Sequence, residues 1–311
     1  MFLSSLFIKR SLKPFFGVRY DGSPAFPYWR CEEFGVEEKR FSFTSGKWKL
    51  RGSKYFVKGS KPKALVIFFH GLGDGRASYI KEISLLAKEG YLVYAYDNTG
   101  CMESEGNSII SFDQTLKDQK AFFKFLEFDE DSKGLKRYSI GHSWGGFGAM
   151  MSCKPEYKIE KCVSMAGFCK TVDVVVARYG KRCNSYIKNA IKLTIKNLVK
   201  NDSNKSAVDE IKSSSAEVLY IYGEKDKLVT KDIGFNLLNK EFKNERRVHF
   251  LEVKNVGHSV FRTPESEAYV GSLLKKGLGN LNSPEALSMD IEKATKENDK
   301  VWSTIFGFYS K

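Results

Sequence analysis

The sequence predicts an α/β protein built around a mostly parallel β-sheet. Short, continuous apolar runs recur along the chain and alternate with stretches of helical periodicity. An apolar run of this length, such as 64–71, which ends in Gly71, is typical of a strand buried on both faces. Strands that alternate with helices imply βαβ crossovers, which produce a parallel sheet.

Eight strands are expected. The first two, at 40–45 and 48–57, carry turn signals and suit an antiparallel entry to the sheet. The other six are expected at 64–71, 91–97, 137–143, 162–168, 218–223 and 248–253. Helices are expected at about 76–89, 113–128, 144–152, 231–243 and 264–276.

Three parts are expected in the 311-residue chain: an N-terminal arm (1–39), one large α/β domain (40–277) and a C-terminal helical extension (278–311). Ser283-Pro284-Glu285 has the composition of a helix start in that extension. With 42% apolar residues, a chain of this size can bury a large core, which excludes a disordered chain.

Charge and cysteine content bear on partners and location. The net charge is +14, carried by 39 Lys against 12 Arg, and nucleic-acid readers favour Arg, so no nucleic acid is expected. The six cysteines show no metal-ligand spacing, so no metal is expected, and they indicate a reducing compartment. The N-terminus lacks the features of a signal peptide and no apolar window reaches about 18 residues. A cytoplasmic protein is therefore expected.

One long insertion interrupts the alternating pattern between the strands at 162–168 and 218–223. Residues 184–200 place apolar side chains on one helical face and Lys188, Lys192, Lys196 and Lys200 on another. This lysine row is either an ordinary solvated face or a surface that contacts anionic lipid headgroups. Both interpretations stay open from the sequence.

The chemistry is indicated by Gly141-His-Ser143-Trp-Gly145, between the strand at 137–143 and the helix at 144–152. G-x-S-x-G in a strand–turn–helix context is a nucleophile elbow, in which a tight turn presents the Ser hydroxyl above the sheet. The helix N-terminus then directs the Trp144 backbone N–H toward a developing oxyanion.

A Ser nucleophile needs a histidine base held by a carboxylate. Of the four histidines, His258 follows the last expected strand on a loop from which its side chain can reach a site. Asp226 follows the strand at 218–223, with Glu224 as the competing acid. The order Ser143, Asp226, His258 is the Ser–acid–His order of α/β-hydrolases. The glycine-rich segment 70–75 offers the Leu72 N–H as a second oxyanion donor, or is a plain turn.

Taken together, these motifs resemble the monoacylglycerol lipase, lysophospholipase and serine aminopeptidase-like branch of the α/β-hydrolases. The matching pieces are HGLGDG at 70–75, D-x-x-G at 97–100 with S-E-G at 104–106, GHSWGG at 141–146, GEKD at 223–226 and GH at 257–258. The resemblance implies an eight-stranded sheet, a helical cap at about 169–216, and no cofactor. The span 97–104 departs from the D-x-R-G-H-G-x-S that such proteins often carry, so the substrate subgroup is not defined.

These observations predict a serine hydrolase that cleaves carboxylic esters with an acyl group. A peptidase or acyltransferase on the same fold is the alternative, because the same triad serves amides and other acceptors. An aminopeptidase would need carboxylates to hold the substrate amine, whereas the insertion is basic. A non-catalytic binding protein would normally have lost one member of the triad.

Overall fold

The computed structural model describes residues 13, 16–22, 28–73, 75–179, 185–186, 189–190, 193–194, 205–278 and 288–311. Its strands are β1 (Glu37–Ser45), β2 (Trp48–Phe56), β3 (Leu65–Phe69), β4 (Leu92–Tyr96), β5 (Arg137–His142), β6 (Ile159–Met165), β7 (Glu217–Gly223) and β8 (Val248–Val253). They form one sheet in the order β1-β2-β4-β3-β5-β6-β7-β8. β2 pairs antiparallel with β1 and β4, and every later pair is parallel. The predicted mostly parallel sheet with an antiparallel entry is confirmed.

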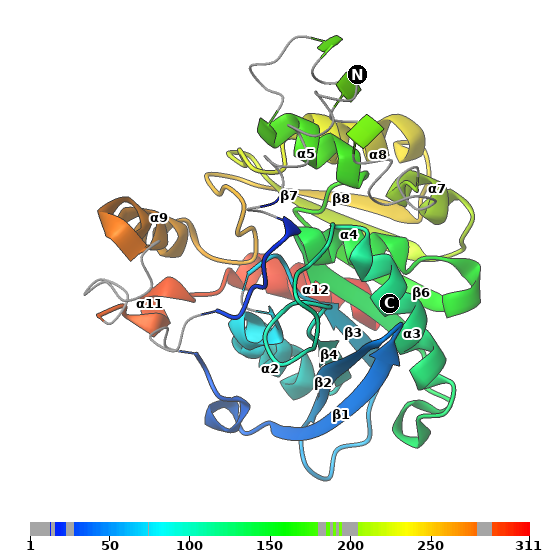
Figure 1. The fold of residues 1–311 in the computed structure, drawn as a ribbon. Coiled ribbons are helices and arrows are strands. Elements are labelled where there is room, and N and C mark those ends of the chain that lie inside the picture. The colour runs from blue at the N-terminus through cyan, green and yellow to red at the C-terminus, as the bar shows by residue number, and fades with distance from the viewer. Residues whose placement is uncertain are drawn as a thin grey trace.

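Helices cover both faces of this sheet (Figure 1). The α-helices are α2 (Ile80–Lys88), α3 (Gln114–Leu126), α4 (Trp144–Met151), α5 (Thr171–Tyr179), α7 (Ala207–Lys212), α8 (Phe235–Phe242), α9 (Pro264–Leu273), α11 (Ile291–Ala294) and α12 (Asp299–Ser310). The short 3-10 helices are η1 (Cys31–Phe34), η2 (Gly75–Tyr79), η3 (Glu130–Ser132), η4 (Pro155–Tyr157) and η6 (Lys231–Ile233), and η7 (Leu274–Leu278) is a π-helix.

The apolar runs of the parallel strands supply two cores, one on each side. In β3, Leu65, Ile67 and Phe69 face α3, α4, α7 and α8, whereas Val66 and Phe68 face α2 and α12. Because side chains alternate along a strand, a continuous apolar run is what a sheet covered on both faces requires. No helix in the described part of the chain is long and apolar enough to cross a membrane.

Several predicted elements differ in their bounds from the structure, among them the helix expected at 76–89, which is divided into η2 and α2. The strand expected at 162–168 is β6, which ends at Met165 because Ala166 adopts a positive φ of 50° and turns the chain out of the sheet. The helix expected at 231–243 is divided at Gly234, where a Cβ would lie 2.1 Å from the Tyr220 hydroxyl oxygen. At Gly234 a close packing contact decides the element boundary, which periodicity cannot reveal.

The insertion between β6 and β7 begins with α5 and ends with α7. Between them, Thr194 is buried and Ala190 packs against the core, whereas Tyr186 and Leu193 are exposed. These positions agree with the expected apolar face of 184–200. Lys188, Lys192, Lys196 and Lys200 lie outside the described residues, so their contact with a membrane stays a prediction.

The C-terminal segment docks on the α2 side of the sheet. Val301, Trp302 and Ile305 of α12 are buried there, and the Tyr309 hydroxyl donates to the Ser139 carbonyl in β5 at 2.8 Å. The expected helix start at 283–285 lies outside the described residues. The division into arm (1–39), domain (40–277) and extension (278–311) remains a proposal, with β1 beginning at Glu37 and η1 before it.

Candidate active site

Ser143 lies in a strained turn between β5 and α4. Its φ is 57° and its ψ is −115°, a conformation that a residue with a Cβ rarely adopts. The Ser143 N–H donates to the Met165 carbonyl of the neighbouring β6 at 2.8 Å, which holds the turn against the sheet. Ser143 therefore has the backbone geometry expected of a nucleophile elbow.

The glycines of the elbow permit backbone contact that no side chain would allow. A Cβ at Gly145 would lie 1.9 Å from the Phe69 carbonyl oxygen, and one at Gly141 would lie 2.2 Å from the Gly145 oxygen. Both distances are far inside van der Waals contact, and the atoms involved belong to the backbone and cannot rotate away. The spacing Gly-x-Ser-x-Gly is thus a steric requirement of the crossing between β3, β5 and α4.

His258 and Asp226 are brought together at the carboxyl ends of β8 and β7. His258 Nδ1 donates to Asp226 Oδ2 at 2.8 Å, and their side chains are 17% and 3% exposed, respectively. Asp226 Oδ1 accepts the N–H groups of Leu228 at 2.8 Å and Val229 at 3.0 Å, so the carboxylate is fixed by its own loop. With Nδ1 donating, a neutral His258 leaves Nε2 as an acceptor.

Glu224, the competing acid, points elsewhere. It is exposed, accepts the Asn255 N–H at 3.0 Å and pairs with Lys254 Nζ at 3.4 Å. These contacts, the Asn255 N–H first, lower the pKa of Glu224. Of the two acids that the sequence left open, only Asp226 contacts the His258 ring in the described structure.

One cavity of about 380 Å³ joins the predicted site residues, since Ser143, His258, Leu72 and Trp144 all line it. Most of its other walls are apolar, from the sheet ends, the segment before α3, the loop after β7 and the cap helix α5: Phe112, Phe168, Val174, Val175, Leu228 and Val229. Such a cavity suits an apolar substrate group oriented by a few polar atoms.

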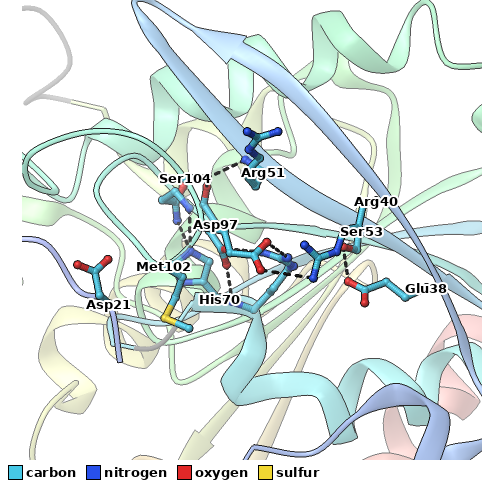
Figure 2. Close-up of polar contacts among 12 residues, drawn as sticks. Asp21, Glu38, Arg40, Arg51, Ser53, His70, Asp97, Met102 and Ser104 are labelled. Atoms are coloured by element: carbon cyan, nitrogen blue, oxygen red, sulfur yellow. Dashed lines mark hydrogen bonds and ion pairs between the residues drawn. The ribbon is translucent and has the colours of Figure 1, made fainter. Parts of the chain in front are cut away.

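The loop that carries Leu72 is anchored by a buried ion pair. Asp97 accepts the Arg76 backbone N–H at 2.8 Å and pairs with the Arg76 guanidinium, which also contacts Glu103 at 2.7 Å. Figure 2 shows Asp97 between His70 and Ser104, whose hydroxyl donates to the Asp97 carbonyl at 2.6 Å. Burial raises the Asp97 pKa to about 6, against the opposing effect of Arg76. The residues at 97–104 thus act on the site through the loop at 70–79.

Two further histidines, His70 and His142, hold the same loops, although the sequence motifs do not indicate a role for either. His142 Nε2 donates to the His258 carbonyl at 3.0 Å, and His142 Nδ1 accepts from the Tyr79 hydroxyl at 2.9 Å. Tyr79 in turn accepts the Gly71 N–H at 3.2 Å. Since a carbonyl only accepts, His142 carries a proton on Nε2, and a neutral ring then leaves Nδ1 as the acceptor for the Tyr79 hydroxyl. Burial lowers the His142 pKa well below its ordinary value.

His70 is also held neutral. Its Nδ1 donates to the Gly71 carbonyl at 2.6 Å and its Nε2 accepts the Asn98 N–H at 3.0 Å. Full burial lowers the His70 pKa to about 4. In the sequence these histidines stand out only because they precede Gly71 and Ser143. Apart from Gly71, their hydrogen-bond partners Asn98, Tyr79 and His258 lie in distant segments.

The described residues contain no group of three His, Cys, Asp or Glu side chains that could hold a metal ion. A hydroxyl on a strained turn, an imidazole that lines the same cavity and a buried carboxylate bonded to that imidazole are groups that nucleophilic catalysis uses.

Sheet order, elbow and strand-end loops together define an α/β-hydrolase. The family model described as "Serine aminopeptidase, S33" matches residues 60–240, more than half of the chain. The chain belongs to this family.

Similarity to individual proteins is more limited. The chain is 28% identical to human monoglyceride lipase over 99 residues, which is 32% of this chain and 33% of the lipase. It thus matches about a third of the length of this curated relative. An esterase of Pyrococcus furiosus superposes with a TM-score of 0.60 at 20% identity, covering 85% of this chain and 97% of the esterase. The acylaminoacyl peptidase of Pyrococcus horikoshii gives 0.59 at 15% identity, covering 89% and 41%. At these identities the two structures establish the fold alone.

The steric role of Gly145 yields a stability prediction. Gly145→Ala forces a Cβ against the Phe69 carbonyl and should lower the free energy of unfolding by about 3 kcal/mol or more. Gly307→Ala is the matched control, because that exposed α12 position has open space and should gain up to about 1 kcal/mol of helix propensity. Urea unfolding followed by circular dichroism measures both. Equal stability of the two variants would contradict the steric account.

The depressed His70 pKa predicts a dependence of stability on pH. The folded pKa is about 4 and the ordinary value is 6.5, so the unfolded chain binds a proton that the folded chain rejects. The neutral His70 therefore contributes fully to the free energy of unfolding above pH 6.5, and this contribution declines as the pH falls. At pH 4 the free energy of unfolding has decreased by about 3 kcal/mol.

Urea unfolding at pH 7.5, 5.5 and 4.5 should show a shallower decline for His70→Gln than for the wild-type chain. Protonation of Asp97 affects the stability of the wild-type and His70→Gln chains alike, so it cancels when their pH dependences are compared. His249→Gln, at an exposed strand position, is the control and should keep the wild-type slope. A parallel decline in all three chains would show that His70 does not contribute.

Proposed function

We propose that this chain is a serine hydrolase that cleaves carboxylic esters through Ser143, His258 and Asp226. The observation that carries the proposal is the 2.8 Å hydrogen bond from His258 Nδ1 to the buried Asp226, on loops that meet Ser143 at one cavity. Leu72 and Trp144 supply the backbone N–H groups of the oxyanion hole. No cofactor or metal takes part in the proposed reaction.

In the first half of the reaction, Ser143 Oγ attacks the ester carbonyl while His258 Nε2 takes its proton. Asp226 stabilises the resulting imidazolium and holds the ring in the required tautomer. The Leu72 and Trp144 N–H groups stabilise the tetrahedral oxyanion, for which one such donor is typically worth about 3 kcal/mol. The C–O bond to the alcohol then breaks, and His258 returns the proton to the departing oxygen.

In the second half, water hydrolyses the acyl group on Ser143. His258 takes a proton from the water as its oxygen attacks the acyl carbonyl, and a second oxyanion forms at the same N–H groups. Its collapse releases the carboxylic acid, and the proton passes from His258 back to Ser143 Oγ. The two halves use the same groups in reversed roles.

An ester substrate is proposed in preference to an amide because of the residues that line the cavity. Among the described lining residues there is no carboxylate, and the one permanently charged side chain is Lys227. An aminopeptidase needs an anion to hold the substrate amine, which this cavity does not offer. The apolar walls favour an acyl chain, in keeping with the name of the monoglyceride lipases. A peptidase or an acyltransferase is the second candidate, favoured by the family description.

Two further proposals concern surroundings rather than chemistry. A cytoplasmic location is supported by the five described cysteines, which are all buried free thiols. Peripheral contact with an anionic membrane through Lys188, Lys192, Lys196 and Lys200 is supported by their spacing in the sequence alone.

Loss of the nucleophile tests the proposal directly. Ser143→Ala should reduce hydrolysis of a nitrophenyl ester to background, a loss of about 10⁶-fold in kcat if the triad acts as a unit. Labelling by a fluorophosphonate probe should also disappear, while circular dichroism stays unchanged. Ser303→Ala on the exposed face of α12 is the control and should remain fully active. Persistent labelling of folded Ser143→Ala would refute the assignment.

Loss of the acid separates Asp226 from Glu224. Asp226→Asn should lower kcat by about 10⁴-fold, because an amide can hold His258 in the wrong tautomer. Glu224→Gln removes the same charge two residues away but leaves the His258 contact intact, so its kcat should stay close to wild type. Steady-state kinetics on one ester measures both variants. A larger loss in Glu224→Gln would identify Glu224 as the acid.

A further inference from the structure

Resting on the proposed function, we infer that Glu267 is a positioning residue for His258. Its carboxylate, in the first turn of α9, bridges the two backbone N–H groups on either side of the histidine. Glu267 is nine residues beyond His258 and has no place in the motifs that indicate the triad.

Both carboxylate oxygens of Glu267 are used in this contact. Oε2 accepts the Gly257 N–H at 2.5 Å and Oε1 accepts the Ser259 N–H at 3.2 Å. Together the two bonds fix the peptide groups before and after His258, and so they restrict rotation of the backbone that aims the imidazole. Hydrogen bonds to a carboxylate are roughly twice as strong as neutral ones, which makes this an effective clamp.

The absence of a side chain at Gly257 makes room for the carboxylate. A Cβ there would lie 2.9 Å from Glu267 Oε1, which real Cβ atoms essentially never approach, and 3.2 Å from Oε2, which is tighter than most real contacts. The glycine before the histidine is therefore matched to the glutamate on α9.

A third bond adds to this restraint. His142 Nε2 donates to the His258 carbonyl at 3.0 Å, and the two imidazole rings lie 4.7 Å apart between centroids. The His258 segment is thus held both by α9 and by the turn that carries Ser143. Asp226 restrains the His258 ring, whereas Glu267 and His142 restrain the backbone that carries it.

The helix that presents Glu267 is itself well anchored. Thr263 caps α9 by accepting the Ser266 N–H at 3.2 Å, and Pro264 occupies the first turn. The Ser266 hydroxyl donates to the Ala294 carbonyl of α11 at 2.7 Å, which ties the start of α9 to the C-terminal segment. A rigid support of this kind is what a positioning group requires.

The experiment compares Glu267→Gln with Glu265→Gln, an exposed position in the same helical turn that loses the same charge. Glutamine keeps one acceptor oxygen but turns an NH₂ donor toward the second N–H, so one of the two bonds is lost. Because small misplacements of a catalytic group cost up to about 100-fold, kcat for a nitrophenyl ester should fall about 10- to 100-fold in Glu267→Gln. KM should stay within about twofold, since Glu267 does not line the cavity.

Two further readouts separate positioning from general destabilisation. The downfield NMR signal of the His258 Nδ1 proton should broaden or shift in Glu267→Gln and remain unchanged in Glu265→Gln. Glu267→Asp, which keeps both oxygens on a shorter stem, should recover part of the lost kcat. Urea unfolding of the Gln variants confirms that each is folded under the assay conditions.

Gly257→Ala disrupts the same contact by changing the residue whose N–H donates to Glu267. Its Cβ displaces the Glu267 carboxylate, so this variant should reproduce the fall in kcat. The double variant Gly257→Ala/Glu267→Gln should be no worse than the more damaging single variant, because both remove one interaction.

Equal kcat and an unchanged NMR signal in Glu267→Gln and Glu265→Gln would overturn the inference. Full additivity in the double variant would overturn it as well. Failure of the proposed function has a different signature, namely an active Ser143→Ala. An inactive Ser143→Ala together with a wild-type Glu267→Gln would leave the serine hydrolase in place and exclude only the positioning role.

Discussion

The first turn of α4 packs its backbone directly against the carboxyl end of β3, where a Cβ at Gly145 would lie 1.9 Å from the Phe69 carbonyl oxygen. This contact leaves Ser143 at a φ of 57°, a strained conformation that only a surrounding structure can maintain. The same approach brings the segment after β3, with Gly71 and Leu72, to the rim of the cavity that contains Ser143. Placement of the proposed nucleophile and of the proposed oxyanion loop thus follows from one backbone crossing.

A second crossing of the same kind brings the acid and the histidine together. A Cβ at Gly223 would lie 1.9 Å from the Gly257 oxygen, so the loops after β7 and β8 pass in backbone contact. Lys225 then donates its N–H to the Val256 carbonyl at 2.9 Å, which fixes the register of the two loops immediately before Asp226 and His258. Since β7 and β8 are adjacent and parallel, their carboxyl ends lie at one edge, and the glycines allow the loops there to touch.

The sequence was sufficient for the sheet and for the turn around Ser143 because both depend on local patterns. Apolar runs predicted the strands, and Gly-x-Ser-x-Gly predicted the turn around Ser143. The end of β6 was predicted three residues too late, since the chain leaves the sheet at the positive φ of Ala166, which the apolar pattern does not encode. His142 and Glu267 were not assigned roles for a related reason. Their hydrogen bonds reach the His258 segment across 116 and 8 to 10 residues, and only the folded chain brings these groups together.

The buried charged side chains of Asp97 and Arg76 do not line the cavity. Asp97 and Arg76 pair beneath the segment that carries Leu72, and His70 and His142 are held neutral by burial. A charge removed from water is costly unless it is paired, so anchors of this kind stabilise a loop best when they satisfy one another away from solvent. The cavity itself then keeps mostly apolar walls, and the buried Asp226 has His258 as its partner. In such surroundings two backbone N–H groups act on a developing negative charge far more strongly than they would in water, because little solvent screens them. Because the Asp97–Arg76 ion pair lies away from the cavity, it anchors the loop and also leaves the proposed oxyanion hole in mostly apolar surroundings.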